Sequence, residues 1–203
     1  MKIIEDGRAP NPRRVRIFLA EKGIQMEYEQ VDITEFDHKK PEFTSLNPLQ
    51  RVPVLMLDDG TAISESMAIC RYFEELQPEP ALLGKDALGK AKVEMWQRRM
   101  ELSLMQPVAQ TFRHLHPAMA EMEKPQVAAW GEVNRPRALS MLKLLDQELA
   151  NRPFIAGDEF TAADITGLVA VDFMKPARID RPENSPNLDR WHAEVSSRPS
   201  AKA

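Results

Sequence analysis

The chain has 203 residues with 43% hydrophobic and 29% charged side chains, a composition that excludes general disorder and indicates a protein with a buried core. Lys and Arg number 27 against 31 Asp and Glu, giving a net charge of -4 without any long basic run, so no nucleic-acid partner is expected. The single cysteine, Cys70, excludes an internal disulfide framework and favours a reducing compartment. Because there is no recognisable signal peptide and no apolar run of ~18–20 residues, we expect a cytoplasmic protein that binds no membrane.

The first part of the chain alternates short β-type segments with helical ones. Ile3 and Ile4 begin a strand, and a helix follows in which Asn11 is the expected N-cap, with Pro12 at the first helical position and Gly23 just beyond the end. The remaining elements are strands over 28–33 and 52–57, a hairpin turn at 58–60, a returning strand over 61–63 and a helix over 64–76. This order, βαβ followed by ββα, predicts a thioredoxin-like domain over residues 1–77.

After a stiff, proline-containing linker at 77–80, almost all of the remaining sequence has helical spacing. Helices are expected over 86–116, 126–150, 162–174 and 187–197, with a kink or break at Pro107. Thr161 and Asp164 have the spacing of a capping box, which is a role in folding. The predicted fold class is therefore α+β, with a thioredoxin-like domain over 1–77 followed by an all-α domain over 86–203.

Two neighbouring segments of the first domain are candidates for a ligand site. Pro53 interrupts an apolar strand, either as an edge-strand proline or as a cis-proline whose preceding residue pairs its backbone with a peptide-like ligand. Glu65 and Ser66 open the next helix, and taken alone they indicate simple capping. The hairpin brings them to the same end of the sheet as Pro53, which favours a site where Ser66 and the helix amides bind a carboxylate and Glu65 accepts from an amine.

Several short motifs follow one another in a recognisable order. They are Lys39-Lys40-Pro41-Glu42-Phe43, Leu46-Asn47-Pro48, Val52-Pro53-Val54-Leu55, Glu65-Ser66-Met67-Ala68-Ile69, Phe154-Ile155-Ala156-Gly157-Asp158 and Thr161-Ala162-Ala163-Asp164-Ile165, with Trp191 and Arg198-Pro199-Ser200 near the end. In this order and spacing the chain resembles the cytosolic glutathione transferases over essentially its whole length. It is most similar to bacterial and fungal members that lack the usual Tyr, Ser or Cys catalytic residue.

The resemblance implies a set of residues that hold glutathione as a co-substrate. Glu65 and Ser66 would bind the γ-glutamyl end. Val52 would pair with the cysteinyl backbone ahead of a cis Pro53. The glycine carboxylate would meet Lys39, with Lys40, Gln50 and the neighbouring His38 as further candidates.

The loop before the first helix, residues 7–14, contains no Tyr, Ser or Cys to stabilise a thiolate. Asn11 is one candidate substitute, because its side-chain amide and the helix N-terminus both favour a thiolate. Positive charge from Arg13 or Arg14 is a second candidate. His114 or His116, reaching over the cleft directly or through a water, is a third. We therefore take Asn11 and His114 as the candidate catalytic residues.

The resemblance implies a glutathione transferase that adds the thiolate to small hydrophobic electrophiles. Its pocket would be lined from the loop near Ala9-Pro10 and from the helix that carries Met100, Leu104, Phe112 and His114. Two alternatives remain open: a glutathione-dependent disulfide reductase or peroxidase on the same fold, which needs an accessible thiolate but no shaped pocket, and a non-catalytic binding module. A homodimer is also expected, with Met67, Arg71, Trp96 and Arg99 as contact residues. Cys70 is expected to be a core residue and not a nucleophile.

Overall fold

The computed structural model describes all residues, 1–203, which fall into two compact units. The first unit comprises Met1–Leu82 together with Pro199–Ala203, and the second comprises Leu83–Arg198. The last five residues were expected to belong to the 86–203 domain, but they belong to the first unit because they pack on its first helix. Arg13 donates to the carbonyl of Ala201, and the Ser200 hydroxyl donates to Glu21. The α+β fold class is confirmed.

The first unit is built on a four-stranded sheet of order β2-β1-β3-β4. β1 pairs in parallel with β2, whereas the β1–β3 and β3–β4 pairs are antiparallel. Its strands and helices are β1 (Lys2–Glu5), α1 (Pro10–Glu21), β2 (Glu27–Gln30), η1 (Asp37–Lys39), α2 (Pro41–Leu46), β3 (Val54–Met56), β4 (Ala62–Ser64) and α3 (Ser66–Leu76), with the 3-10 turn η4 (Pro199–Lys202) at the C-terminus. The predicted βαβ and ββα order is confirmed, and η1 and α2 between β2 and β3 are additional elements that were not predicted from the sequence.

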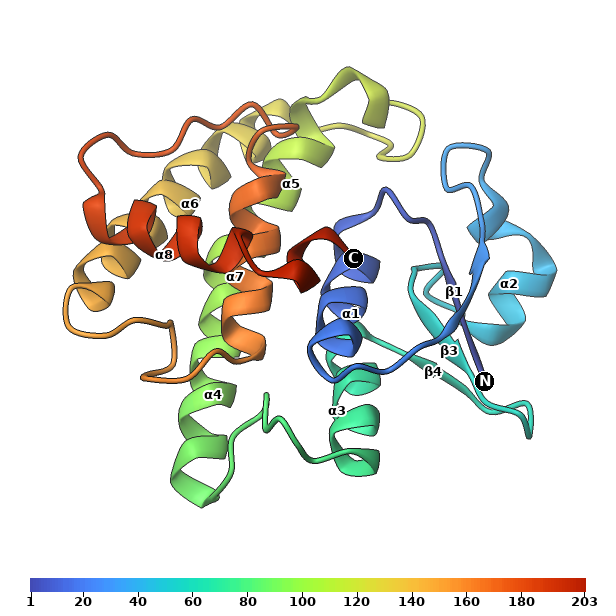
Figure 1. Cartoon of the computed structure of the whole chain (residues 1–203). Helices are drawn as coiled ribbons and strands as arrows, with labels where there is room; N and C mark the ends of the chain where they lie inside the picture. The colour runs from blue at the N-terminus through green and yellow to red at the C-terminus, as the bar shows by residue number, and fades with distance from the viewer. The chain divides into compact units, whose positions relative to one another are not determined.

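The two faces of this sheet bury alternate residues of its strands. Helices α1 and α3 lie together on one face, and α2 lies on the other (Figure 1). Ile4 and Val54 pack with Phe43 of α2 in one cluster. Their neighbours Ile3 and Leu55 point to the opposite face and are fully buried. The sheet is therefore covered by helices on both sides. This packing holds the ends of the strands in place, so that they can position the residues of a binding site.

Helix α1 begins two residues earlier than the sequence predicts. Its N-cap is Ala9, no side chain caps it, and Pro10 occupies the first turn together with Pro12. Both prolines fit there because the amides of a first turn have no intrahelical partner. The prediction that Asn11 is the N-cap was therefore wrong. At the other end Gly23 adopts φ +67, and Ile24 N–H donates to Leu19 C=O, which completes the expected glycine C-cap.

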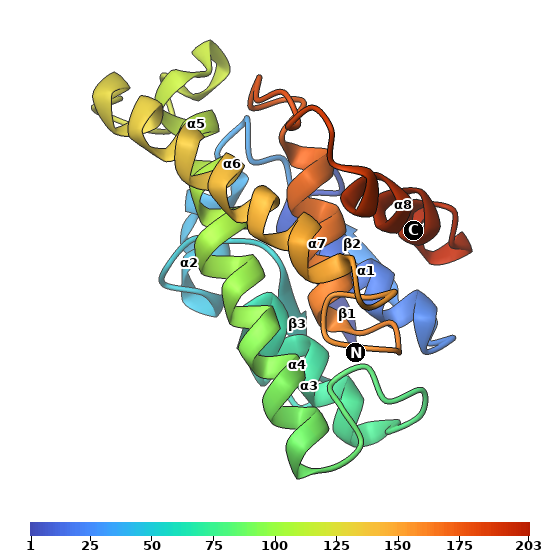
Figure 2. The same cartoon turned by 90° about the vertical axis from the view of Figure 1, so that its left-hand side faces the viewer.

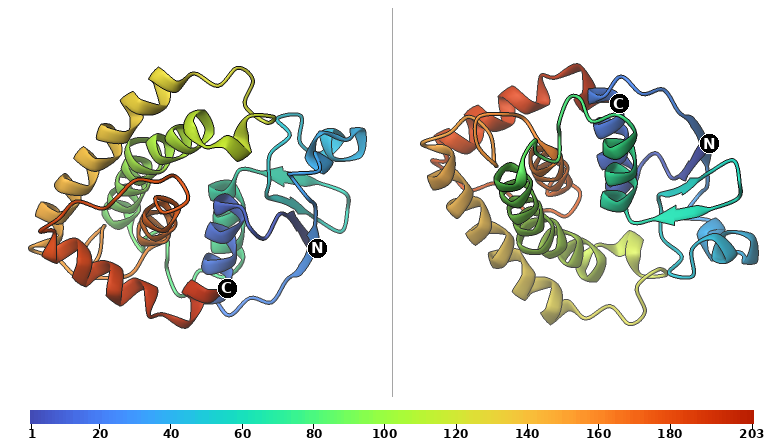
Figure 3. Two further views of the ribbon diagram at one scale, coloured as in Figure 1. Left: turned by 90° about the horizontal axis from the view of Figure 1, so that it is seen from above. Right: turned by 90° about the horizontal axis from the view of Figure 1, so that it is seen from below.

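The second unit is helical. Its elements are α4 (Ala87–Arg99), the π-helical segment η2 (Met100–Met105), α5 (Gln106–Leu115), the 3-10 turn η3 (Pro117–Met119), α6 (Ala128–Leu149), α7 (Ala162–Phe173) and α8 (Pro186–Ser196). Residues 162–171 of α7 are all buried, and η2, α4, α5 and α8 of this unit pack against it (Figure 2, Figure 3). No helix of the chain is both long enough and apolar enough to cross a bilayer.

The irregularity expected at Pro107 is the π-helical segment directly before it. Proline cannot donate to the carbonyl four residues earlier, and its ring collides with that group in a regular α-helix. Widening the preceding turn relieves this collision while the helix continues into α5. Met100 and Leu104 of this segment are 0% exposed. They are core residues, so the expectation that they line a substrate pocket was wrong.

Candidate functional site

The β3–β4 hairpin aligns the two candidate ligand segments. Val54 pairs with Ser64, so the preceding Pro53 and the following Glu65 leave the hairpin at the same end. The Val52–Pro53 peptide is cis, and β3 lies inside the sheet between β1 and β4, which excludes the edge-strand interpretation of Pro53. The backbone N–H and C=O of Val52 form no hydrogen bond within the chain. They can therefore pair with an extended, peptide-like ligand.

Glu65 and Ser66 form the start of α3 without capping it. The residue at the N-cap position is Glu65, with φ 71 and ψ 117, and no side chain hydrogen-bonds to the first-turn amides. A left-handed φ costs a residue with a Cβ ~1–3 kcal/mol and is commonly found at functional sites. Ser66 is buried, whereas the Glu65 side chain is exposed. The simple capping interpretation was thus wrong, and the amides and the hydroxyl remain able to bind an anionic group.

The basic residues near the second strand have different partners. Lys40 forms an ion pair with Asp37 at 2.6 Å. Lys39 has no carboxylate partner, and its Nζ lies 4.5 Å from the centre of the Phe36 ring. Of the two lysines, Lys39 is therefore the one able to bind a ligand carboxylate.

His38 and Gln50 are the other candidates near this loop. The pKa of His38 is lowered, mainly by burial and secondarily by the charge of Lys39, so the ring is neutral at pH 7. Its Nδ1 is buried without a hydrogen-bond partner. The Gln50 side chain donates to the Thr44 hydroxyl at 3.0 Å, and its φ is 53. Gln50 is thus engaged in shaping its own turn, with its amide oxygen still able to accept.

Arg51 is a candidate that the sequence reasoning missed. It is exposed and directly precedes Val52, the residue with the unpaired backbone. Its charge and its position beside the cis-proline motif were the signal available in the sequence. A cation directly next to the ligand-pairing segment favours an anionic ligand.

Asn11 lies in the first turn of α1 and is exposed. Its Oδ1 accepts a hydrogen bond from Arg14 Nη1 at 3.3 Å. This contact orients the amide so that its NH2 group, a donor, is left over for a ligand. Donation from this amide and the positive end of the helix dipole both stabilise an anion at this turn.

His114 and His116 belong to the second unit and have partners within it. His114 Nδ1 accepts from the Val127 backbone N–H at 3.1 Å, so its proton sits on Nε2, which lies 4.0 Å from a Glu123 oxygen. His116 Nδ1 accepts from the Ala118 backbone N–H and its ring stacks on Phe112 at 4.8 Å. Both histidines organise the connection between α5 and α6. Each ring therefore carries its proton on Nε2, and both Nε2–H groups are left to donate.

Comparison with known proteins gives the same assignment over both units. Residues 9–76 match the model of the glutathione S-transferase N-terminal domain, and residues 108–199 match that of the C-terminal domain. The chain is 38% identical to glutathione S-transferase 2 of Saccharomyces cerevisiae over 205 residues, covering 100% of this chain and 88% of the relative. The chain belongs to the glutathione S-transferase family.

Solved structures of the family agree with this assignment. A glutathione S-transferase domain-containing protein from Marinobacter aquaeolei superimposes with a TM-score of 0.96 at 37% identity, covering 98% of this chain and 99% of that protein. The structure of Gtt2 from Saccharomyces cerevisiae gives 0.95 at 38% identity, covering 100% and 99%. In this glutathione S-transferase the candidate residues Val52, Pro53, Glu65 and Ser66 all lie within the matched N-terminal domain.

Proposed function

We propose that this chain is a glutathione transferase that holds glutathione on the first unit. The observation that carries the proposal is the alignment of the unpaired Val52 backbone with the uncapped start of α3 at one end of the sheet. Glutathione has a carboxylate and an amine at its γ-glutamyl end, a peptide-like centre and a glycine carboxylate at the other end. Ser66 and the α3 amides suit the first carboxylate, Glu65 the amine, Val52 the centre and Lys39 the glycine carboxylate.

The reaction requires the glutathione thiol to lose its proton at neutral pH. A free thiol has a pKa of ~8.5, so the protein must stabilise the thiolate. We assign this role to the Asn11 amide and the N-terminus of α1. The amide can donate a hydrogen bond to the thiolate, and the positive end of the helix dipole stabilises its negative charge. The sulfur then attacks an electrophilic carbon of a small hydrophobic substrate. A C–S bond forms, and the displaced electron pair leaves with a leaving group or is protonated by solvent.

Calorimetry and the ultraviolet absorbance of the thiolate test this proposal. We expect saturable binding of glutathione and a bound-thiol pKa well below that of free glutathione. Asn11→Ala should raise this pKa toward the free value, and Asn11→Asp should raise it further because a carboxylate repels the thiolate. Asn151→Ala, on an exposed residue of the second unit, is the matched control. Absence of glutathione binding by the unmodified protein would overturn the proposal.

His114 is the second candidate for thiolate stabilisation, and the same titration separates it from Asn11. An unchanged bound-thiol pKa in Asn11→Ala together with a raised value in His114→Ala would move the role to His114 Nε2. Because His114 also accepts from the Val127 backbone, the variant His114→Gln, which has both an acceptor and a donor, should be measured beside it. An effect of His114→Ala that His114→Gln restores would point to the α5–α6 connection and not to a proton on the histidine.

Glutathione-dependent disulfide reduction or peroxide reduction is the second candidate activity. The exposure of Asn11 favours it, because an accessible thiolate can exchange with a bulky disulfide. In that reaction the thiolate attacks one sulfur of the substrate, a mixed disulfide forms, and the other sulfur leaves as a thiolate. The thiolate of a second glutathione then attacks the glutathione sulfur of the mixed disulfide, so that glutathione disulfide forms and the remaining substrate sulfur leaves as a thiolate. Turnover of a model disulfide without turnover of chlorinated aromatic or enone substrates would favour this activity, and binding without turnover would favour a binding module.

We further propose a cytoplasmic homodimer. Leu88, Met95 and Leu102 lie seven residues apart along α4 and η2 and are 65%, 41% and 52% exposed. Leu102 also lines a pocket of 770 Å³ between α5 and α6, with the exposed Trp130 in its wall. A second copy would cover this apolar surface.

Trp96, expected as a dimer contact, is only 3% exposed and packs inside the second unit. Light scattering of Leu102→Glu and Trp130→Glu should report monomers; an unchanged mass would contradict the dimer.

A further inference from the structure

The carboxylate of Asp6 lies at the end of β1 and is almost completely buried. It accepts three hydrogen bonds from Arg8: from the backbone N–H at 2.9 Å, from Nε at 2.9 Å and from Nη2 at 2.6 Å. It also accepts from the backbone N–H of Ile33 at 3.2 Å. Hydrogen bonding from Arg8 holds the pKa of Asp6 below its usual range. Asp6 thus fixes the Arg8 side chain in one geometry and joins the first loop (residues 6–9) to the second loop (residues 32–40).

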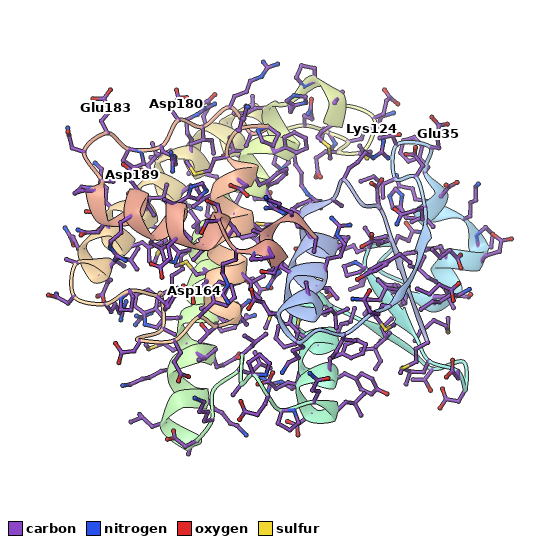
Figure 4. The ribbon with its side chains drawn as sticks, viewed as in Figure 1. Glu35, Lys124, Asp164, Asp180, Glu183 and Asp189 are labelled. Atoms are coloured by element: carbon purple, nitrogen blue, oxygen red, sulfur yellow. The ribbon has the colours of Figure 1, made fainter.

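Arg8 reaches into the second loop through the same guanidinium nitrogen. Nη2 donates to Asp32 Oδ1 at 2.7 Å. The same Asp32 oxygen accepts from the Thr34 backbone N–H at 2.8 Å, and the Asp32 N–H donates to Asp37 at 2.9 Å. Asp32 therefore closes the turn that leads to η1 and Lys39. Glu35 marks this loop in Figure 4. The geometry of the second loop therefore depends on the Asp32 carboxylate, which is bonded by Arg8 of the first loop.

The first loop has separate attachments that do not involve Arg8. The N–H of Gly7 donates to Gln30 Oε1 at 2.9 Å, and its carbonyl accepts from Arg16 Nη2 at 2.9 Å. Arg16 is in turn paired with the buried Glu5 at 2.7 Å. The chain leading into α1 and Asn11 is thus held at both Gly7 backbone groups. Loss of the Arg8 side chain should loosen the second loop while the first loop keeps its position.

We propose that Arg8 is a positioning residue for the glycine end of glutathione, acting through Asp32 on the loop that carries Lys39. The inference rests on the proposed function, because it concerns how the same ligand is held. Arg8 itself makes no contact with the ligand in this scheme. Its contribution is to restrict the second loop before binding, so that less conformational freedom is lost when Lys39 meets the carboxylate.

The test compares two ligands that differ only at that end. Calorimetry gives the dissociation constants of glutathione and of γ-glutamylcysteine, which lacks the glycine. In Arg8→Gln we expect glutathione to bind about two- to fivefold more weakly, the size of effect typical of one exposed charged contact, and γ-glutamylcysteine to bind unchanged. The pKa of the bound thiol should also stay unchanged, because Gly7 keeps its own attachments. A merely structural role would weaken both ligands equally, and that result would overturn the proposal.

Two further variants sharpen the test. Lys2→Gln is the matched control, because it removes a 2.6 Å ion pair between Lys2 of β1 and Glu29 of β2. It should leave the dissociation constants of both ligands unchanged. Combining Arg8→Gln with Lys39→Gln should weaken glutathione no more than Lys39→Gln alone, because both changes act at one contact. Additive losses would contradict the proposal. If the unmodified protein binds neither ligand, the proposed function fails, and that outcome is distinct from equal weakening in Arg8→Gln.

Discussion

Asp164 Oδ1 accepts a hydrogen bond of 2.8 Å from the indole nitrogen of Trp191, and both residues are fully buried in the second unit. The same carboxylate accepts from the backbone N–H groups of Ile155 and Thr161 and from the Thr161 hydroxyl. It therefore joins the start of α7 to α8 and to the loop before α7. Figure 4 labels Asp164 at the start of α7, away from the labelled acidic residues Asp180 and Glu183. The predicted capping box with Thr161 is confirmed.

Loss of this carboxylate should strongly destabilise the second unit. Asp164→Ala leaves four donors without an acceptor, and we expect the free energy of unfolding to fall by about 3–5 kcal/mol. Asp164→Asn keeps one acceptor oxygen and should lose less. Trp191→Phe removes one donor and also leaves a cavity where the fully buried indole packed, so its cost includes a packing loss. Urea denaturation followed by circular dichroism measures the two Asp164 variants. A loss in Asp164→Asn equal to or larger than that in Asp164→Ala would contradict the network as described.

The γ-glutamyl end of the proposed ligand depends on the charge of Glu65. Glu65→Gln keeps the size of the side chain but removes the charge that attracts the ligand amine, so the dissociation constant of glutathione should rise about tenfold. Glu75→Gln, on an exposed residue of the same helix, is the matched control and should leave binding unchanged. Calorimetry at 0.1 M salt distinguishes them. Equal effects of the two variants would show that only overall charge matters.

Cys70 should be unreactive in the folded protein. It is 2% exposed on α3, and burial raises the pKa of its thiol to about 12, so almost no thiolate is present at pH 7. We expect no labelling by a thiol reagent such as dithionitrobenzoate in buffer and one thiol per chain in 6 M guanidinium chloride. Rapid labelling in buffer would contradict its assignment as a core residue.

The network around Arg8 should make stability fall in acid. The pKa of Asp6 is lowered mainly by Arg8, and that of Asp32 by Thr34 and then Arg8. A carboxyl group with a lowered pKa in the folded state contributes stability above its unfolded value of 3.8 and loses it as the pH falls further. The melting temperature of Asp6→Asn should lie below that of the unmodified protein at pH 7, and this difference should narrow below about pH 4. A difference that stays constant down to pH 2 would exclude the charge as its cause.

Much of the fold followed from local patterns in the sequence. The βαβ and ββα order, the helices over most of residues 86–197 and the Thr161–Asp164 capping box are all set by residues close together in the chain. The prediction that Pro53 and Glu65 lie at the same end of the sheet was also confirmed, because a hairpin of known length fixes which ends meet. The roles of Asn11, His114, Lys39, Gln50, Val52, Glu65 and Ser66 toward glutathione stay predictions.

The errors lie where local signals compete. Two prolines near Asn11 both suit a first helical turn, and only the packed helix decided that it begins at Pro10. Apolar residues such as Met100 and Leu104 occur in pocket walls as well as in cores. In the structure they are buried in the segment that packs against α7, so they belong to the core.

By itself, the sequence determined the types and order of the elements, since helix and strand formation depend on neighbours within a few residues. Only the tertiary structure decided which distant polar groups meet. The buried Asp164–Trp191 pair spans 27 residues and the partly buried Arg13–Ala201 contact spans 188. Such partners are chosen by burial: a charged or polar group removed from water must find a counterpart, and the packed chain determines which one is within reach.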